Sequence, residues 1–185
     1  VAADGAAASG KTTGSRIISR KYGLKFLSSG LLYRYAGQQL LKYKPKNEIK
    51  FLKLKFKKLN YNKINKINLH SPKISEYTSI IAKQKKIRNV LKKFQQDFAS
   101  KHKRVCIEGR DIGTVILPKA DLKFFFICNF KIAAKRRFKE LKKKNKFLKF
   151  ENVKKELQNR NLRDVSRKNS PLLKSPDAVI VDTGK

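Results

Sequence analysis

Residues 5–12 of this 185-residue chain read GAAASGKT and match the pattern G-x-x-x-x-G-K-[ST]. Glycines at both ends allow a tight loop whose N–H groups point inward as a nest for phosphate oxygens, with the positive end of a following helix facing the same anion. An apolar stretch at residues 1–3 precedes the loop, and Ile17, Ile18 and Tyr22 follow it in a helical pattern. Because strand, loop and helix come in the required order, we predict a phosphate-binding loop rather than an ordinary Gly/Ala turn.

The loop pattern assigns roles to a run of consecutive residues. We expect Lys11 to reach the β- and γ-phosphates of a nucleotide, and Thr12 or Thr13 to help hold Mg²⁺. The predicted nucleotide-binding residues are Gly5, Ala6, Ala7, Ala8, Ser9, Gly10, Lys11, Thr12 and Thr13.

Strand and helix patterns alternate along the chain. Strands are expected at residues 1–3, 24–27, 104–107, 122–128 and 178–181, and the 122–128 run is apolar enough for a strand buried on both faces. Helices are expected at residues 11–20, 75–101, 131–141 and 151–163, and after residue 29, where Ser29 is a candidate cap. This order predicts an α/β fold with a parallel sheet.

Residues 42–70 differ from the rest of the chain. They are rich in Lys and Asn, with Glu48 as the only acidic residue, and their periodicity fits either short strands or a basic helix. We interpret them as an insertion at the edge of a single domain.

The chain carries 47 Lys and Arg residues against 13 Asp and Glu, a formal net charge of +34. The excess is mostly Lys, spread along the whole chain, which fits an A/T-rich genome better than a localised nucleic-acid site, although a basic nucleic-acid-binding protein remains an alternative. No apolar run is long enough to span a membrane and no signal peptide is visible, so we expect a cytoplasmic protein. Cys106 and Cys128 both lie in apolar runs and are expected to be reduced and buried.

Arginines stand out against this Lys-rich background. Arg110 and Asp111 follow a predicted strand, at the edge of the sheet where the phosphate loop also begins. If residues 160–167 are helical, Arg160, Arg163 and Asp164 share one face with Arg167. An exposed i,i+4 pair is the ordinary interpretation of such a cluster, but the planar fork of Arg binds phosphate in two-point fashion, whereas Lys does not.

Several segments together resemble the bacterial cytidylate (CMP/dCMP) kinases, a branch of the P-loop nucleoside monophosphate kinases. The segments are ADGAAASGKTT, SSGLLYR (residues 28–34), EGRDIGTVILPKADLKFFF (108–126), KRRFKEL (135–141) and RNLRDVSRKNSPL (160–172), in family order over nearly the full chain. The resemblance implies a five-stranded parallel sheet flanked by helices in one domain, residues 1–185. It further implies a core of residues 1–41 and 73–185, an insertion at the monophosphate site at about 42–72, and a helical lid at about 131–163.

The resemblance also implies a reaction, in which ATP with Mg²⁺ phosphorylates CMP or dCMP. Ser79, Arg88 and Asp111 match positions that read cytosine, and Arg136 and Arg137 fall in the lid over ATP. The implied catalytic residues are Lys11, Arg110, Arg136, Arg137 and Arg167. The implied substrate-binding residues are Ser29, Arg34, Ser79, Arg88, Arg110, Asp111, Arg160, Asp164 and Arg167. We expect a monomer without membrane or specific nucleic-acid partners, and a kinase of the same fold acting on UMP is the nearest alternative.

Some positions depart from the family pattern. Ser28 and Glu108 stand where Asp is usual, Asn161 where Asp is common, and His70 where Arg is expected. Lys-Thr-Thr replaces the usual Lys-Gly-Thr at the end of the loop, which leaves open whether the first or the second Thr serves Mg²⁺.

Overall fold

Five parallel strands form one central sheet in the structure, a computed structural model that describes residues 1–64, 67–143 and 145–185. The strands are β1 (Ala2–Gly5), β2 (Lys25–Ser28), β3 (Val105–Gly109), β4 (Lys123–Ile127) and β5 (Val179–Asp182). Their order across the sheet is β2-β3-β1-β4-β5, and Ala3 of the central β1 pairs with Glu108 on one side and Phe124 on the other. The predicted five-stranded parallel α/β sheet is therefore confirmed.

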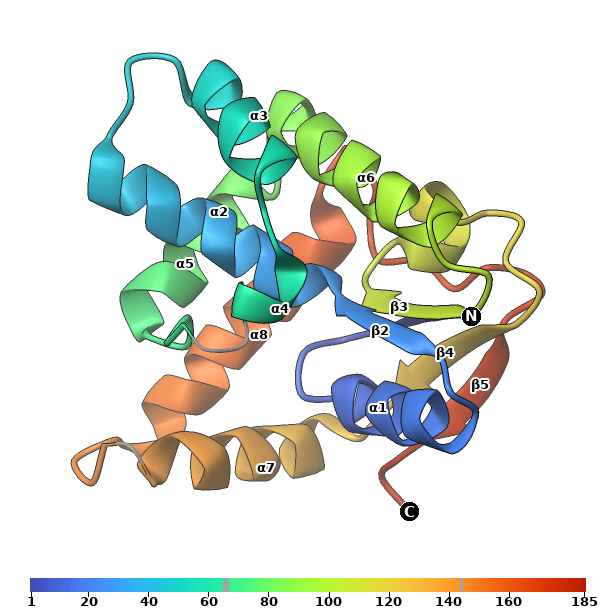
Figure 1. The fold of residues 1–185 in the computed structure, drawn as a ribbon. Helices are drawn as coiled ribbons and strands as arrows, with labels where there is room; N and C mark the ends of the chain where they lie inside the picture. The colour runs from blue at the N-terminus through green and yellow to red at the C-terminus, as the bar shows by residue number, and fades with distance from the viewer. Residues whose placement is uncertain (65–66, 144) are drawn as a thin grey trace.

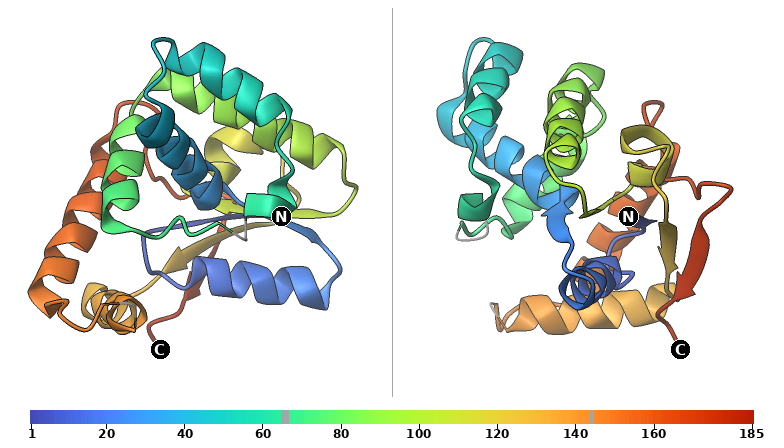
Figure 2. Two further views of the ribbon diagram at one scale, coloured as in Figure 1. Left: turned by 60° about the vertical axis from the view of Figure 1, so that its left-hand side comes forward. Right: turned by 45° about the vertical axis from the view of Figure 1, so that its right-hand side comes forward.

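Helices cover both faces of the sheet. In Figure 1, α2, α3 and α6 lie above the strands and α1 and α7 lie below them. The left view of Figure 2 shows α8 running along one side of the molecule, from α7 up to α5. The helices are α1 (Lys11–Lys21), α2 (Ser29–Tyr43), α3 (Glu48–Lys57), α4 (Tyr61–Ile64), α5 (Pro72–Ile81), α6 (Lys85–Ser100), α7 (Phe130–Lys142) and α8 (Phe150–Ser166), and a π-helical turn, η1 (Ile112–Ile116), follows β3.

The Lys-rich stretch after α2 is helical where the structure describes it. Asn47 caps α3 by accepting a hydrogen bond from Lys50 N at 2.9 Å. Leu52 and Phe56 of α3 and Tyr61 and Ile64 of α4 belong to the main core, which also holds residues of the sheet such as Leu27 and Ile107. The strand alternative for residues 42–70 is therefore wrong in the described part, where α3 and α4 form and contribute buried side chains to the main core.

The single helix expected at residues 75–101 is wrong. α5 ends at Ile81 and α6 begins at Lys85, with extended backbone at Gln84 between them. The break frees the Ala82 carbonyl, which accepts a hydrogen bond from Arg88 Nη1 at 3.1 Å. Helical periodicity does not report such a side-chain contact to the backbone, and the apolar pattern continues across the break.

Two expectations about burial also need correction. β4 is only partly buried, because Phe124 and Phe125 remain half-buried and Ile127 is exposed. Cys128 lies beyond the end of β4 and is half-buried, whereas Cys106 in β3 is fully buried as predicted. The periodicity of an apolar run indicates a strand, but the cover on each face depends on which elements pack there.

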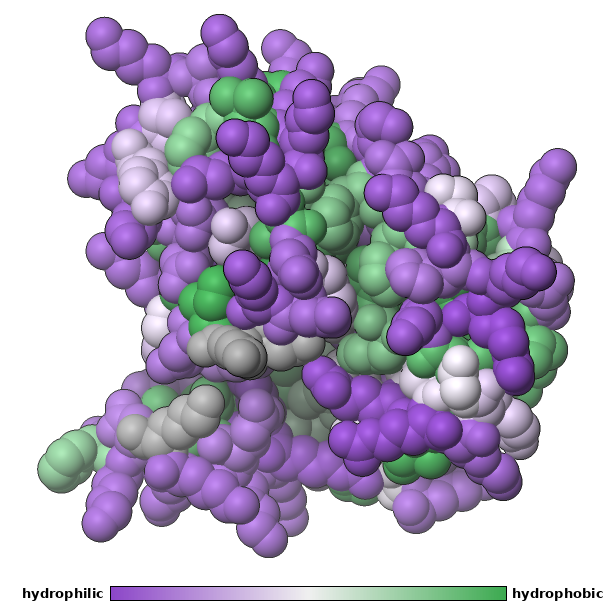
Figure 3. Space-filling view, viewed as in Figure 1, coloured by the Kyte–Doolittle hydropathy of each residue, from purple (hydrophilic) through white to green (hydrophobic). Residues whose placement is uncertain are grey.

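Hydrophilic side chains spread over the whole face drawn in Figure 3, with apolar atoms showing mainly between them. This spread of hydrophilic residues over the face fits a chain whose lysines are distributed along its whole length. In the part of the chain that the structure describes, none of the helices is both long enough and apolar enough to cross a membrane.

Candidate active site

The loop between β1 and α1 has the backbone of a phosphate cradle. Gly5 has φ +153°, and a Cβ added there would lie 2.4 Å from the Phe126 carbonyl oxygen. Gly10 has φ +75° and stands at the N-cap of α1, where no described side chain caps the first amides. Ser9 is buried, and its Oγ has no hydrogen-bond partner among the described residues. The glycines thus adopt the conformations that a tight loop requires, and the N-terminus of α1 and the Ser9 hydroxyl are groups that could bind an anion.

One cavity of about 480 Å³ collects nearly all of the predicted site residues. Its lining includes every residue predicted to bind substrate or to act in catalysis. Of the loop residues, Gly5 and Ala6 lie outside the lining. The predicted residues in the lining are Ala7, Ala8, Ser9, Gly10, Lys11, Thr12, Thr13, Ser29, Arg34, Ser79, Arg88, Arg110, Asp111, Arg136, Arg137, Arg160, Asp164 and Arg167.

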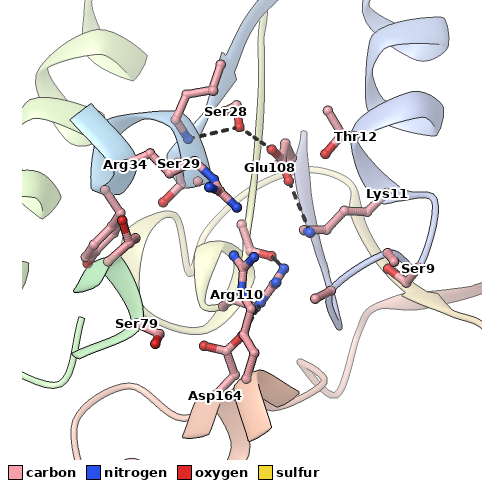
Figure 4. Close-up of a pocket in the computed structure, with 18 of the residues that line it drawn as sticks. Ser9, Lys11, Thr12, Ser28, Ser29, Arg34, Ser79, Glu108, Arg110 and Asp164 are labelled. Carbon is pink, nitrogen blue, oxygen red and sulfur yellow. Dashed lines mark hydrogen bonds and ion pairs between the residues drawn. The ribbon is translucent and has the colours of Figure 1, made fainter. Parts of the chain in front are cut away.

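Lys11 and Glu108 meet at the centre of this cavity. Lys11 Nζ lies 3.4 Å from Glu108 Oε2, and the Ser28 hydroxyl donates to the other Glu108 oxygen (Figure 4). Burial and the positive charge of Arg110 lower the pKa of Lys11 and Glu108 raises it, and the net result is a pKa of about 8. Burial alone would raise the pKa of Glu108, but Lys11 and the Ser28 hydrogen bond keep it below its ordinary value. Both groups are therefore held as an ion pair at neutral pH.

Ser28, and not Ser29, caps α2. The Ser28 hydroxyl accepts a hydrogen bond from Leu31 N at 3.4 Å, and the backbone N–H of Ser28 donates to Tyr61 Oη at 2.6 Å. Ser29 is the first helical residue and lines the cavity. The predicted cap is thus off by one residue, since either serine satisfies the sequence pattern and only the helix start distinguishes them.

Asp164 accepts hydrogen bonds from two arginines of the cavity. Its Oδ2 accepts from Arg110 Nε at 2.7 Å, and its Oδ1 from Arg167 Nη1 at 3.3 Å. Arg110 Nη1 also donates to the Gly5 carbonyl at 2.7 Å, which ties this cluster to the loop. Burial would raise the pKa of Asp164, but Arg110 and Arg160 lower it below its ordinary value. Arg167 lies just beyond the end of α8, so the predicted helical face stops one residue short.

Arg88 and Asp111 form a second buried pair farther from the loop. Arg88 Nη2 donates to Asp111 Oδ2, and its guanidinium lies 5.5 Å from the centre of the Tyr33 ring. Arg88 Nε is buried without a hydrogen-bond partner among the described residues, and the same holds for Arg167 Nη2. Buried donors left open in this way are unusual and indicate a place for a ligand acceptor.

Arg34 and Arg160 add positive charge to the same cavity. Arg34 Nη1 donates to Ser75 Oγ at 2.7 Å and to the Leu69 carbonyl at 3.0 Å, so it also fixes the segment before α5. Burial lowers the pKa of both guanidinium groups, and they and Arg110 and Arg137 repel one another. The cavity thus holds more cationic groups than carboxylates, an arrangement that an anionic ligand would stabilise.

Arg136 and Arg137 line the cavity but are held by other partners in this conformation. Arg136 donates to Thr183 O at 2.6 Å and to Thr183 Oγ1 at 3.0 Å. Arg137 Nη1 pairs with Glu140 Oε2 at 2.9 Å. Both arise from α7, in the segment predicted to be a lid.

Three further residues contact the site: Asp4 and Asn161, to which the sequence assigned no role, and Arg163, which it placed only in the arginine cluster around Asp164. Asp4 accepts from Ile112 N and Gly113 N, both at 2.8 Å, and so holds the turn that follows Asp111. Asn161 Oδ1 accepts from Ala7 N of the loop at 3.1 Å. Arg163 donates to the Ser79 hydroxyl. Asp4 directly precedes the loop motif, and this position could have marked it as a site residue. The contacts of Asn161 and Arg163 depend on how α8 packs, which sequence spacing does not report.

The residues present suit a Mg²⁺–nucleotide complex better than a metal cage built by protein alone. Among the described residues no group of three or more His, Cys, Asp or Glu side chains could hold a metal ion. The exposed hydroxyls of Thr12 and Thr13 line the cavity near Glu108, and Mg²⁺ often takes only one or two protein oxygens beside substrate phosphates and water. Thr12 is the residue directly after Lys11, where the loop pattern expects the hydroxyl.

Comparisons with known proteins agree over the full chain. A family model described as cytidylate kinase matches residues 1–185. The cytidylate kinase of Thermosipho melanesiensis is 37% identical over 192 residues, covering 99% of this chain and 88% of the relative. Those of Bartonella tribocorum and Rickettsia africae are each 37% identical, covering 100% of this chain and 86% and 84% of the relatives.

Proposed function

The chain belongs to the cytidylate kinase family of phosphotransferases, and from this premise we propose that it transfers the γ-phosphoryl group of ATP to CMP or dCMP. The products are ADP and CDP or dCDP. The observation that carries the proposal is the single cavity in which the phosphate loop, a cluster of buried arginines and the Arg88–Asp111 pair face one another.

At the donor end, the loop amides and Lys11 bind the β- and γ-phosphates of ATP. Phosphoryl transfer depends mainly on alignment and on neutralising charge, because little acid–base chemistry is required. Mg²⁺, held by Thr12 or Thr13 and the phosphates, supplies positive charge to the phosphate oxygens when it is bound. Lys11 supplies a fixed charge, and its pairing with Glu108 aims the ammonium group into the cavity before ATP arrives.

Between the two substrates, arginines bind the phosphoryl group in transit. Arg110 and Arg167, oriented by Asp164, contact the acceptor phosphate together with Arg34 and Arg160. Arg136 and Arg137 join them when α7 closes over ATP, which requires them to leave Thr183 and Glu140. We assign this lid to about residues 131–163 and the acceptor-site insertion to about 42–72, with the core at 1–41 and 73–185. Closure would also keep water from accepting the phosphoryl group.

At the acceptor end, Arg88, Asp111 and Ser79 read the base, with Ser29 nearby. Asp111 Oδ2 accepts a hydrogen bond from Arg88. An ionised carboxylate has no donor, so Asp111 offers only acceptor positions to a ligand. The exocyclic amino group of cytosine is a donor that suits such an acceptor, whereas uracil presents a carbonyl there. A buried polar mismatch of this kind discriminates strongly between ligands. We further propose that the enzyme acts as a monomer in the cytoplasm.

A coupled ADP-release assay tests the proposal directly. ATP with Mg²⁺ is supplied with CMP, dCMP, UMP or AMP, side by side, at moderate salt. We expect turnover with CMP and dCMP and little with AMP, and Asp111→Ala should lower the preference for CMP over UMP. Asp121→Ala, an exposed aspartate, is the matched control and should behave as the unaltered protein. Folded protein that turns over none of the four would overturn the proposal.

A further inference from the structure

The Ser79 hydroxyl has two hydrogen-bond partners, one that accepts and one that donates. Ser79, at the C-terminal part of α5, is 8% exposed and lines the cavity. Its Oγ lies 2.7 Å from the Glu76 carbonyl oxygen, and Arg163 Nη1 of α8 donates to the same Oγ. Figure 4 shows Ser79 facing the end of α8 that carries Asp164.

These partners fix the hydroxyl as an acceptor toward the cavity. A carbonyl only accepts and a guanidinium only donates, so the Ser79 proton goes to Glu76 O and one lone pair goes to Arg163. A hydroxyl has one proton and two lone pairs, which leaves one lone pair for a ligand. To donate into the cavity instead, the hydroxyl would have to turn a lone pair against the Glu76 carbonyl.

Arg163 is itself held in place by its own helix. Its Nε donates to the Asn159 carbonyl at 3.2 Å, one turn earlier in α8. The guanidinium therefore bridges α8 to α5 and pins the rotamer of Ser79. A second hydrogen bond, from Asn169 Nδ2 to the Lys83 carbonyl at 3.2 Å, joins the segments that follow α8 and α5 without touching Ser79.

We propose that Arg163 is a positioning residue for substrate choice, which fixes Ser79 as a hydrogen-bond acceptor and thereby favours a nucleotide base with an exocyclic amino group over one with a carbonyl. This inference rests on the proposed function, since it concerns the base that the acceptor end reads. An amino group has two N–H donors and can serve both Ser79 and Asp111. A carbonyl in that place would face two acceptors, which disfavours uracil by mismatch rather than by shape.

The test compares kcat/KM for CMP and UMP in the full chain carrying Arg163→Met, which keeps a long side chain but removes the donors. We expect the CMP-to-UMP ratio to fall about tenfold, the usual effect of one hydrogen bond, because a Ser79 side chain released from Arg163 can rotate away from the Glu76 carbonyl and donate to uracil. Arg163→Lys, which retains a donor, should recover part of the ratio. Calorimetric Kd values for CMP and UMP without ATP should follow the same order.

Three comparisons separate this role from a merely structural one. In a Ser79→Ala background, Arg163→Met should leave the ratio unchanged, since its effect passes through Ser79. Asn169→Ala removes the other bridge and should shift the values for CMP and UMP together. An unchanged ratio in Arg163→Met, or an equal fall in the Ser79→Ala background, would overturn the inference. Absence of CMP turnover in the unaltered protein would instead overturn the proposed function itself.

Discussion

Lys11 Nζ of the phosphate loop lies 3.4 Å from Glu108 Oε2 at the end of β3, and both side chains are less than a tenth exposed. The two residues are far apart in sequence and are brought together because β1 and β3 are neighbouring parallel strands. The pair gives the ammonium group a fixed direction before any nucleotide binds. It also means that a change at either residue affects both charge balance and catalysis.

Lys11→Ala should abolish turnover while leaving the fold intact. Loss of one fixed charge donor at a transition state typically costs about 10²–10³-fold in kcat. The coupled ADP-release assay with ATP and CMP measures this loss, and Lys21→Ala, an exposed lysine at the end of α1, is the control. The double variant with Glu108→Gln removes the unpaired carboxylate, so it should regain thermal stability but not turnover. Activity retained in Lys11→Ala would contradict the assignment of the phosphate loop.

Activity should fall at alkaline pH because Lys11 loses its proton. Its pKa in the folded protein is about 8, below its ordinary value of 10.5. A profile of kcat/KM for ATP reports groups of the free enzyme, so it should decline as pH rises through about 8. The profile of kcat should decline at higher pH, because bound phosphates favour the charged lysine. A kcat/KM profile that stays flat to pH 9.5 would argue against this role.

The lowered pKa of Lys11 also predicts how stability depends on pH: stability should rise with pH where activity falls. Between pH 8 and 10.5 the unfolded chain holds more protons on Lys11 than the folded chain does. The contribution of Lys11 to the free energy of unfolding should therefore increase with pH across this window. Urea unfolding of the unaltered protein and of Lys11→Ala, at matched pH values, isolates this contribution as the difference in slope.

Asp164→Asn should destabilise the protein and weaken binding of the acceptor. The substitution leaves Arg110 and Arg167 buried without their shared carboxylate, and breaking a buried ion pair typically costs about 3–5 kcal/mol. Saturating CMP should restore part of the loss, because its phosphate replaces the missing negative charge. Asp97→Asn removes an exposed i,i+4 partner of Lys93 and should cost less than about 1 kcal/mol. Equal shifts of Tm in the two variants would contradict this account.

Gly5→Ala tests the backbone of the phosphate loop, and Gly23→Ala, beyond the end of α1, is its control. Both positions have positive φ, but a Cβ at Gly5 would meet the Phe126 carbonyl at 2.4 Å, whereas nothing lies within 4 Å at Gly23. We expect Gly23→Ala to cost about 1–2 kcal/mol and Gly5→Ala about 3 kcal/mol or more, with a raised KM for ATP only in Gly5→Ala. Chemical unfolding and the steady-state assay measure the two effects. Similar behaviour of both variants would show that the close approach at Gly5 has no special role.

Local sequence was sufficient for the features whose cause is local. The loop motif, the alternation of strands and helices and the run of arginines around Asp164 depend on residue types at short spacings. From these alone the parallel sheet was predicted, and the site residues that the motifs marked line one cavity, apart from Gly5 and Ala6. Their individual roles stay predictions until the assays above are made.

Sequence reasoning failed where the cause is a side-chain contact or a packing arrangement that residue periodicity does not report. The apolar pattern continues through residues 82–84, but the helix breaks there and Arg88 donates to the Ala82 carbonyl. The burial of β4 depends on which helices cover it, which no spacing within 122–128 encodes.

By itself, then, the sequence determined the phosphate loop, the α/β layering and the set of charged side chains available to the site. Only the tertiary structure decided how those charges pair: Lys11 with Glu108, Asp164 with Arg110 and Arg167, and Arg163 with Ser79. The physical reason is the distance along the chain over which each interaction acts. Backbone propensity and side-chain spacing act over a few residues, whereas pairing of buried polar groups is settled by which strands and helices become neighbours, and each buried donor or acceptor must then find its partner there.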